Sequence, residues 1–145
     1  MGKENEQGAK FKKNPAPGQV DYKIKEAIEK ISLDGNLGCE EAARIASTLI
    51  KSMAEVGRTL DVNEVSITKC QLGLFGYRPR KIIVSPAQTV DPKMEEAIGK
   101  KLVNGCLPCE AAWEIAQAFA CSKIKVASAC ETLSIKIKPC QLGAF

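Results

Sequence analysis

The stretch CQLGLF at residues 70–75 returns almost unchanged at residues 140–145, where the chain reads CQLGAF. When the sequence is shifted against itself by 70 residues, positions 20–75 align with positions 90–145 without a gap, and 22 of the 56 aligned pairs are identical. Two copies are too few for a solenoid, in which at least about three repeats stack. The sequence therefore predicts a duplication that gives two small tandem domains of one kind.

The segments outside the two copies differ from them in composition. Residues 1–19 are rich in Lys, Pro and Gly and poor in apolar side chains, which predicts a disordered basic tail. Residues 76–89, GYRPRKIIVSPAQT, form a basic junction whose Ile82-Ile83-Val84 run predicts a strand near residues 80–84. Because each copy is small enough to be marginally stable alone, we expect the two repeats to pack together.

Each copy has the pattern of a small helical domain. Two stretches with apolar residues at helical spacing are followed by a serine, Ser52 or Ser122, that can cap a third helix. Alternating segments at 65–67 and 135–137 then predict one short strand in each copy. The first helix of the first copy has the apolar face Ile24, Ala27, Ile28 and Ile31. The sequence predicts a mainly α fold with short β strands.

The segment EEAARIASTLIKSMAEVGRTL, which begins at Glu40, resembles the helix-turn-helix of bacterial and archaeal regulators in its winged-helix form. That pattern has a small residue in the first helix, a small residue or Gly at the turn, and an aliphatic residue six positions later. The matching residues are Ala46, Ile50 and Val56 in the first copy, and Ala116, Ala120 and Val126 in the second. Ile50 departs from the pattern, because it is neither small nor Gly. The resemblance implies two tandem winged-helix repeats, 20–75 and 90–145, and a transcriptional regulator that binds double-stranded DNA.

The closing hexamers are expected to act as packing caps, with Cys, Leu and Phe turned inward and Gly making the bend. The first hexamer continues into the basic junction and could also form a two-stranded wing. The second ends at Phe145, so no return strand can follow it from its own repeat.

Charge decides how well each copy suits DNA. The chain carries a formal net charge of +4; the first repeat holds 7 basic and 9 acidic residues, and the second holds 7 basic and 6 acidic ones. Cations at the third helices and around the predicted wings are the candidate DNA contacts. They are Lys123, Lys125, Arg58, Lys69, Arg78, Arg80, Lys81, Lys136 and Lys138. The alternative is that these are ordinary solvated charges on a non-catalytic protein-interaction module of the same fold. In either case the acidic first repeat could face a protein partner or form a homodimer.

Seven cysteines and no histidine leave few chemical options. Cys39 and Cys70 recur as Cys109 and Cys140, and small buried core residues account for all four. The second repeat adds the CLPC motif at 106–109, so Cys106, Cys109 and Cys140 could hold zinc or an iron–sulfur cluster. A thiol-based metal or redox sensor is therefore a third hypothesis, and no cofactor is expected otherwise.

Enzymatic activity and membrane insertion are both disfavoured by the sequence. It has no histidine, no phosphate-binding Gly loop and no paired-carboxylate motif, so we expect no enzyme. No apolar run approaches the ~18–20 residues of a membrane-spanning helix, and residues 1–19 have no apolar signal segment. We expect a cytoplasmic protein.

Overall fold

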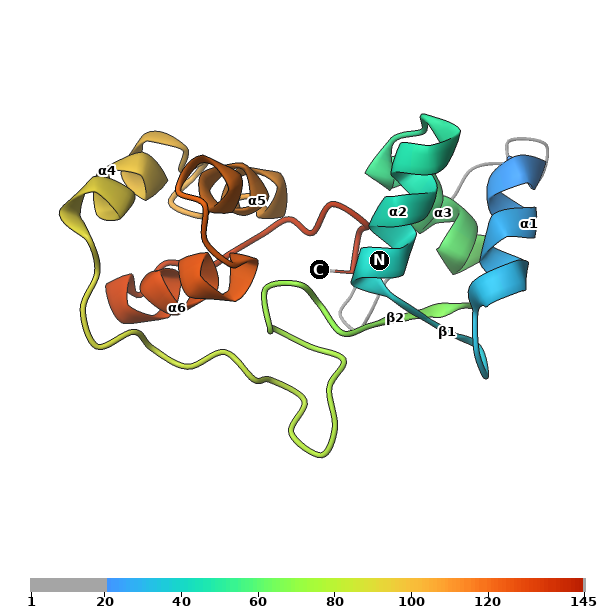
Figure 1. Ribbon diagram of the computed structural model, residues 1–145, viewed down its shortest axis with the longest axis horizontal. Coiled ribbons are helices and arrows are strands. Elements are labelled where there is room, and N and C mark those ends of the chain that lie inside the picture. Colours follow the sequence, from blue (N-terminus) through green and yellow to red (C-terminus); the bar gives the residue numbers. More distant parts are fainter. Residues whose placement is uncertain (1–20, 145) are drawn as a thin grey trace. The chain divides into compact units, whose positions relative to one another are not determined.

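The computed structural model describes residues 21–144, so the predicted tail at 1–19 lies outside the described residues. The described part is mainly helical with two short strands, which confirms the predicted fold class at that level (Figure 1). The elements in chain order are α1 (Tyr22–Ile31), β1 (Asn36–Gly38), α2 (Cys39–Leu49), α3 (Met53–Val62), β2 (Ser66–Thr68), α4 (Pro92–Lys100), α5 (Cys109–Ala118) and α6 (Lys123–Leu133).

The chain divides into two compact units that do not coincide with the two sequence repeats. Among the described residues, unit 1 consists of residues 21–70 together with residues 141–144, and unit 2 consists of Gln71–Cys140. Each closing hexamer is therefore divided between the two units. Its Cys belongs to the unit that contains its own repeat, and the residues after the Cys belong to the other unit. The two units are described separately below.

The three helices of unit 1 form because each has a capped start and one apolar face. Asp21 caps α1 by accepting hydrogen bonds from the N–H groups of Lys23 and Ile24. Ser52 caps α3 in a capping box with Glu55, as predicted for this serine. The core consists of Ile24, Ile28, Leu37, Ala42, Ile45, Val56 and Leu60. Ile31 was expected on the buried face of α1, but its side chain is 45% exposed at the last turn.

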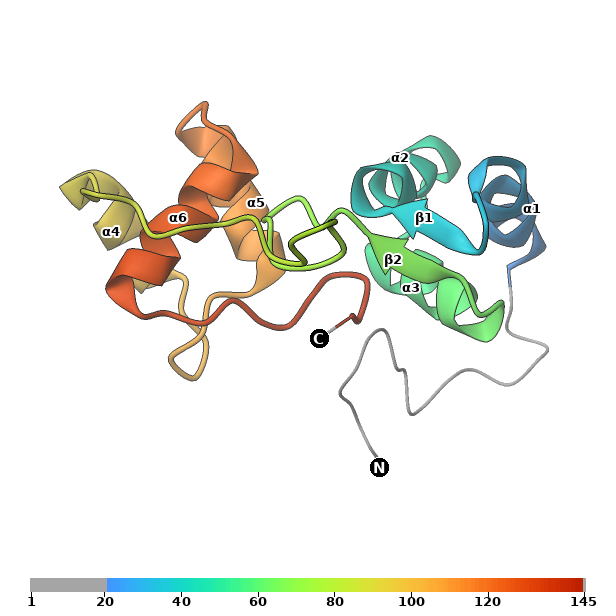
Figure 2. The same cartoon turned by 90° about the horizontal axis from the view of Figure 1, so that it is seen from below.

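The small sheet of unit 1 is a parallel pair. β1 and β2 run side by side with Leu37 opposite Ile67, and both side chains are buried (Figure 2). The crossover between the strands is the α2–α3 pair, which is the kind of long connection that parallel strands require. The predicted strand at 65–67 is confirmed, shifted by one residue to Ser66–Thr68.

The prediction of a strand near residues 80–84 is wrong. The amides of Ile83 and Val84 both donate to the carbonyl oxygen of Gly73, at 2.9 and 3.2 Å, so this stretch lies against a bend instead of a strand ladder. Gly73 adopts φ 77°, a conformation that favours glycine. Within residues 21–144 no strand runs antiparallel to β2, so the expected two-stranded wing is not formed there.

Unit 2 repeats the helical plan of unit 1 with a reduced sheet. Asp91 caps α4 with Pro92 at its first position, and Ser122 caps α6 as predicted. The strand expected at 135–137 is only an isolated parallel bridge between Leu107 and Ile137. In unit 1 the N–H of Ser66 extends the pairing by donating to the carbonyl of Gly35 at 2.8 Å. The described bonds of unit 2 contain no counterpart of that bond; beyond the bridge, its two segments are joined by the bond from the amide of Cys109 to the carbonyl of Pro139 at 3.0 Å.

Candidate functional site

The turn between the second and third helices has the same backbone form in both units. Ile50 follows α2 in the left-handed conformation, with φ 56° and ψ 53°, and Ala120 follows α5 with φ 53°. The next amide then folds back onto the helix, from Lys51 to Ala46 at 2.8 Å and from Cys121 to Ala116 at 3.0 Å. This conformation explains why the turn position suits glycine or a small residue. Ile50 adopts it with a side chain that is 90% exposed.

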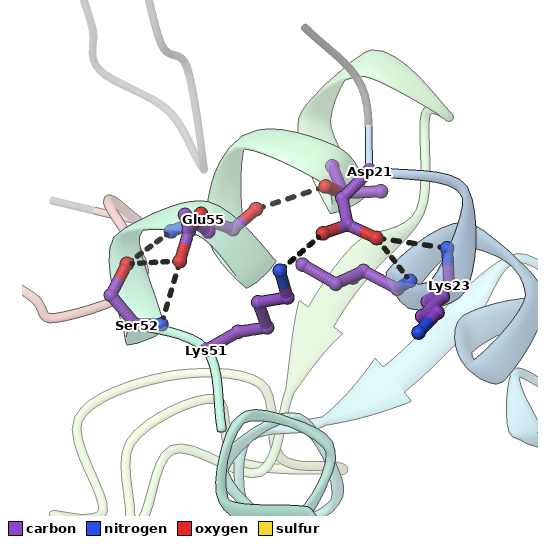
Figure 3. A network of polar contacts seen from close by, with 7 residues as sticks. Asp21, Lys23, Lys51, Ser52 and Glu55 are labelled. Atoms are coloured by element: carbon purple, nitrogen blue, oxygen red, sulfur yellow. Dashed lines mark hydrogen bonds and ion pairs between the residues drawn. The ribbon is translucent and has the colours of Figure 1, made fainter. Parts of the chain in front are cut away.

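An ion pair fixes the start of α1 to this turn in unit 1 (Figure 3). The ammonium of Lys51 lies 2.9 Å from the carboxylate of Asp21, which also caps α1. The hydrogen bond from Lys51 is the main cause that holds the pKa of Asp21 below its ordinary value, and it raises the pKa of Lys51. Beside it, the backbone amide of Ser52 donates to Glu55 at 2.9 Å and lowers the pKa of that carboxyl.

The third helix of unit 1 offers little to DNA. Arg58 is its only cation and is half-buried. Glu55 and Asp61 lie on the same helix, and Glu64 follows it. The surface of α3 is therefore net acidic, which repels phosphate instead of neutralising it.

In unit 2 the two lysines at the start of α6 have different surroundings. The ammonium of Lys123 lies 4.7 Å from the centre of the Trp113 ring, so this lysine is held over α5 by a cation–π contact. Lys125 is exposed. Helical spacing alone does not predict this contact. The repeat alignment does contain a hint of it, because both partners differ between the copies: Trp113 replaces Ala43, and Lys123 replaces Met53.

The junction is bonded to part of the outward face of α6, on which Lys125, Glu131 and Thr132 remain exposed. Val126, Ala127, Ala129 and Cys130 point into the core of unit 2, which leaves Ser128 and Thr132 on the opposite side. There the amide of Ala87 donates to the carbonyl of Ser128 at 3.1 Å, and the hydroxyl of Thr132 donates to the carbonyl of Ala87 at 2.6 Å. Figure 1 shows the junction running beside α6. Sequence reasoning missed this contact, since nothing in the pattern of residues 76–89 indicates where they lie.

The remaining candidate cations are exposed. Arg78, Arg80 and Lys81 share a tight loop in which the amide of Tyr77 donates to the carbonyl of Lys81 at 3.4 Å. Lys136 and Lys138 flank the buried Ile137, so their side chains leave the same side of an extended segment. Lys69 is exposed in unit 1 just after β2. Within the described ranges none of these six cations forms an ion pair.

Charge separates the two units more sharply than it separates the two repeats. Unit 2 holds ten basic and six acidic residues, a net charge of +4, because the junction belongs to it. The described residues of unit 1 hold seven basic and nine acidic ones, a net charge of −2. The exposed cations of the junction and of residues 136–138 therefore lie on one basic unit.

The matched cysteines lie at corresponding ends of the paired segments. Cys39 and Cys70 are buried in unit 1, where they follow β1 and β2. In unit 2 the amide of buried Cys109 donates to the carbonyl of Pro139 at 3.0 Å, so Cys109 lies close to Cys140, which is half-buried. Burial of Cys39, Cys70 and Cys109 agrees with their interpretation as core residues.

The predicted metal ligands Cys106, Cys109 and Cys140 are not brought together as a binding group. Among residues 21–144 no cluster of three or more Cys, Asp or Glu side chains has the arrangement of a metal site. Cys106 is half-buried in the turn before the Leu107 bridge. Burial raises the pKa of the Cys130 thiol on α6 to about 11.

Comparison with known proteins gives no family for this chain. No family model matches it, and neither the curated proteins nor the solved structures contain a significant match. Over the described part of the chain, every helix is too short or too polar to cross a bilayer.

Proposed function

We propose that this chain is a cytoplasmic, non-catalytic DNA-binding protein built from two helix-turn-helix-like units, and that unit 2 makes the contacts. The helical plan, the turn at Ile50 and Ala120, and the small residues before each turn support the relation to helix-turn-helix proteins. The expected wing is missing from the described residues, so the proposal does not rely on a wing.

The observation that carries this proposal is the set of exposed cations on unit 2. Lys136 and Lys138 leave one side of an extended segment, and the loop 77–81 adds Arg78, Arg80 and Lys81. Since these side chains have no carboxylate partner within the described residues, binding phosphate would cost them no ion pair. Cations of this kind bind the DNA backbone and displace its counterions.

The contacts and charges on the outward faces of α3 and α6 indicate how the chain would bind DNA. A helix that reads bases must present its outward face to the major groove. On α6 that face is bonded to Ala87, and on α3 it is acidic. We therefore propose binding through phosphates with little dependence on base sequence. A regulator that recognises an operator would need the junction to leave α6.

The test is the binding of a random duplex measured by fluorescence anisotropy over a series of salt concentrations. The variant Lys136→Gln/Lys138→Gln should bind more weakly, and its log–log salt slope should fall by roughly 2, or about 0.9 per phosphate contact. The matched control Lys23→Gln/Lys30→Gln removes two cations from unit 1 and should leave the slope unchanged. No binding at low salt, or equal effects of the two variants, would overturn the proposal.

A protein-interaction module is the second candidate, favoured by one observation in unit 1. Tyr22 and Ile50 are 72% and 90% exposed, and each adjoins one member of the Asp21–Lys51 ion pair. A β-branched residue in the left-handed conformation costs stability, and an exposed Ile50 regains none of it by packing within the chain. Loss of a partner from pull-downs with Ile50→Asp, with DNA binding unchanged, would support this second role.

A further inference from the structure

The closing hexamers are exchanged between the two repeats. Residues 71–75 come from the first repeat but belong to unit 2, whereas residues 141–144 come from the second repeat but belong to unit 1. The leucines at matched positions, Leu72 and Leu142, are both fully buried. Leu142 of the second repeat thus packs against the first repeat at Gly57, whereas Gly73 of the first repeat lies against Ile83 and Val84 of the junction.

A glycine in α3 allows residues 141–144 to lie close to unit 1. A Cβ atom at Gly57 would collide with the carbonyl oxygen of Leu142 and would lie 3.0 Å from its Cα. Ala144, two residues further on, is 9% exposed. The second repeat has Ala127 at the position of Gly57, so a third helix of this kind accepts a Cβ. The glycine is thus needed for the approach of Leu142 and not for the helix itself.

We propose that the face of α3 at Gly57 is a binding site for an extended Leu-Gly segment, and that residues 141–145 of a second copy of this chain can fill it. The contacts would be those already made within one chain, so the exchanged dimer differs from the monomer chiefly in the entropy of association. Exchange of an identical element between protomers is a low-cost route to dimers.

Two variants, one a deletion and one a substitution, separate the site from the segment that fills it. Deletion of residues 141–145 gives a chain with an empty site and no segment. The variant Gly57→Ala gives a chain with a segment and a blocked site, and alanine is the better helix former at this position. Each variant alone should be a monomer, whereas an equimolar mixture should form a heterodimer of about twice 15.6 kDa in light scattering after chromatography.

Two controls test whether the heterodimer forms through Leu142 and whether the deleted chain folds. Adding Leu142→Asp to the Gly57→Ala chain should weaken the heterodimer at least about 100-fold, because a buried leucine is replaced by a charge. If the deleted chain does not fold alone, a synthetic peptide of residues 139–145 should restore its helical circular dichroism. No heterodimer and no peptide effect would overturn the proposal, as would equal activity of the peptide carrying Leu142→Asp. A normal DNA-binding result in these variants is independent of this outcome.

Discussion

The backbone amide of Ala87 donates to the carbonyl oxygen of Ser128 at 3.1 Å, and this bond holds the junction on the outward face of α6. The junction is therefore part of unit 2 and not a spacer between two domains. The bond lies on the face of α6 that a helix-turn-helix protein turns towards the major groove, while Lys125 and Glu131 on the same helix stay exposed.

We predict that Thr132→Val loosens the junction. The hydroxyl of Thr132 donates to Ala87 at 2.6 Å, and the loss of one such hydrogen bond costs about 1 kcal/mol. Amide hydrogen exchange at Ala87 should become several-fold faster. Ser128→Ala is the matched control, because the contact with Ala87 uses the backbone of Ser128. Equal exchange rates in Thr132→Val and the unaltered chain would contradict the account.

Replacing Ile50 with glycine should stabilise unit 1. Ile50 adopts φ 56° with its side chain 90% exposed, so glycine relieves backbone strain and loses almost no packing. We expect a gain of about 0.5–1 kcal/mol after the greater chain entropy of glycine is included. Urea unfolding measures it. Ala120→Gly should give a smaller gain in unit 2, and a destabilised Ile50→Gly would show that the isoleucine packs in a way the structure does not contain.

Acid should weaken the connection between α1 and the turn after α2. The pKa of Asp21 is lower in the folded chain than in the unfolded one, so the carboxylate stabilises the fold above the unfolded pKa. That contribution is lost as the pH falls from about 5 through the ordinary carboxyl range near 4 and below. Asp21→Asn keeps a capping side chain but no charge. Its stability should vary less with pH over this range than that of the unaltered chain.

Cysteine alkylation should follow burial. Cys130 is 1% exposed and burial raises its pKa to about 11, so almost no thiolate forms at pH 8. Cys106, Cys121 and Cys140 are half-buried and should react first with iodoacetamide, as mass spectrometry of the peptides would show. Rapid modification of Cys130 in the folded protein would mean that α6 separates readily from its unit.

The helices could be predicted from the sequence because their signals are local. Apolar spacing and capping residues such as Ser52 and Ser122 lie within a few positions of the helices they define. Strand signals were weaker: Ile82, Ile83 and Val84 form an apolar run, but their partner is a bend at Gly73 and not another strand. The single bridge at Ile137 likewise depends on a partner, Leu107, that lies far away in the sequence.

The candidate site was only partly predictable for the same reason. Exposed cations such as Lys125 and Lys136 follow from composition and periodicity. The position of Ala87 on α6, the contact of Lys123 with Trp113, and the exchange of Leu72 and Leu142 depend on tertiary packing. The repeat predicted that two copies exist, but it could not show which copy each closing hexamer would complete.

We propose that unit 2 binds DNA through phosphates while the junction stays bonded to Ser128 and Thr132 of α6. The most direct measurement compares the affinity for several unrelated duplexes over a range of salt concentrations, with the Lys136→Gln/Lys138→Gln variant in parallel. The account predicts similar affinities for all duplexes, a steep salt dependence, and a slope lower by roughly 2 in the variant. Salt-independent binding, a strong preference for one duplex, or no binding at low salt would contradict it.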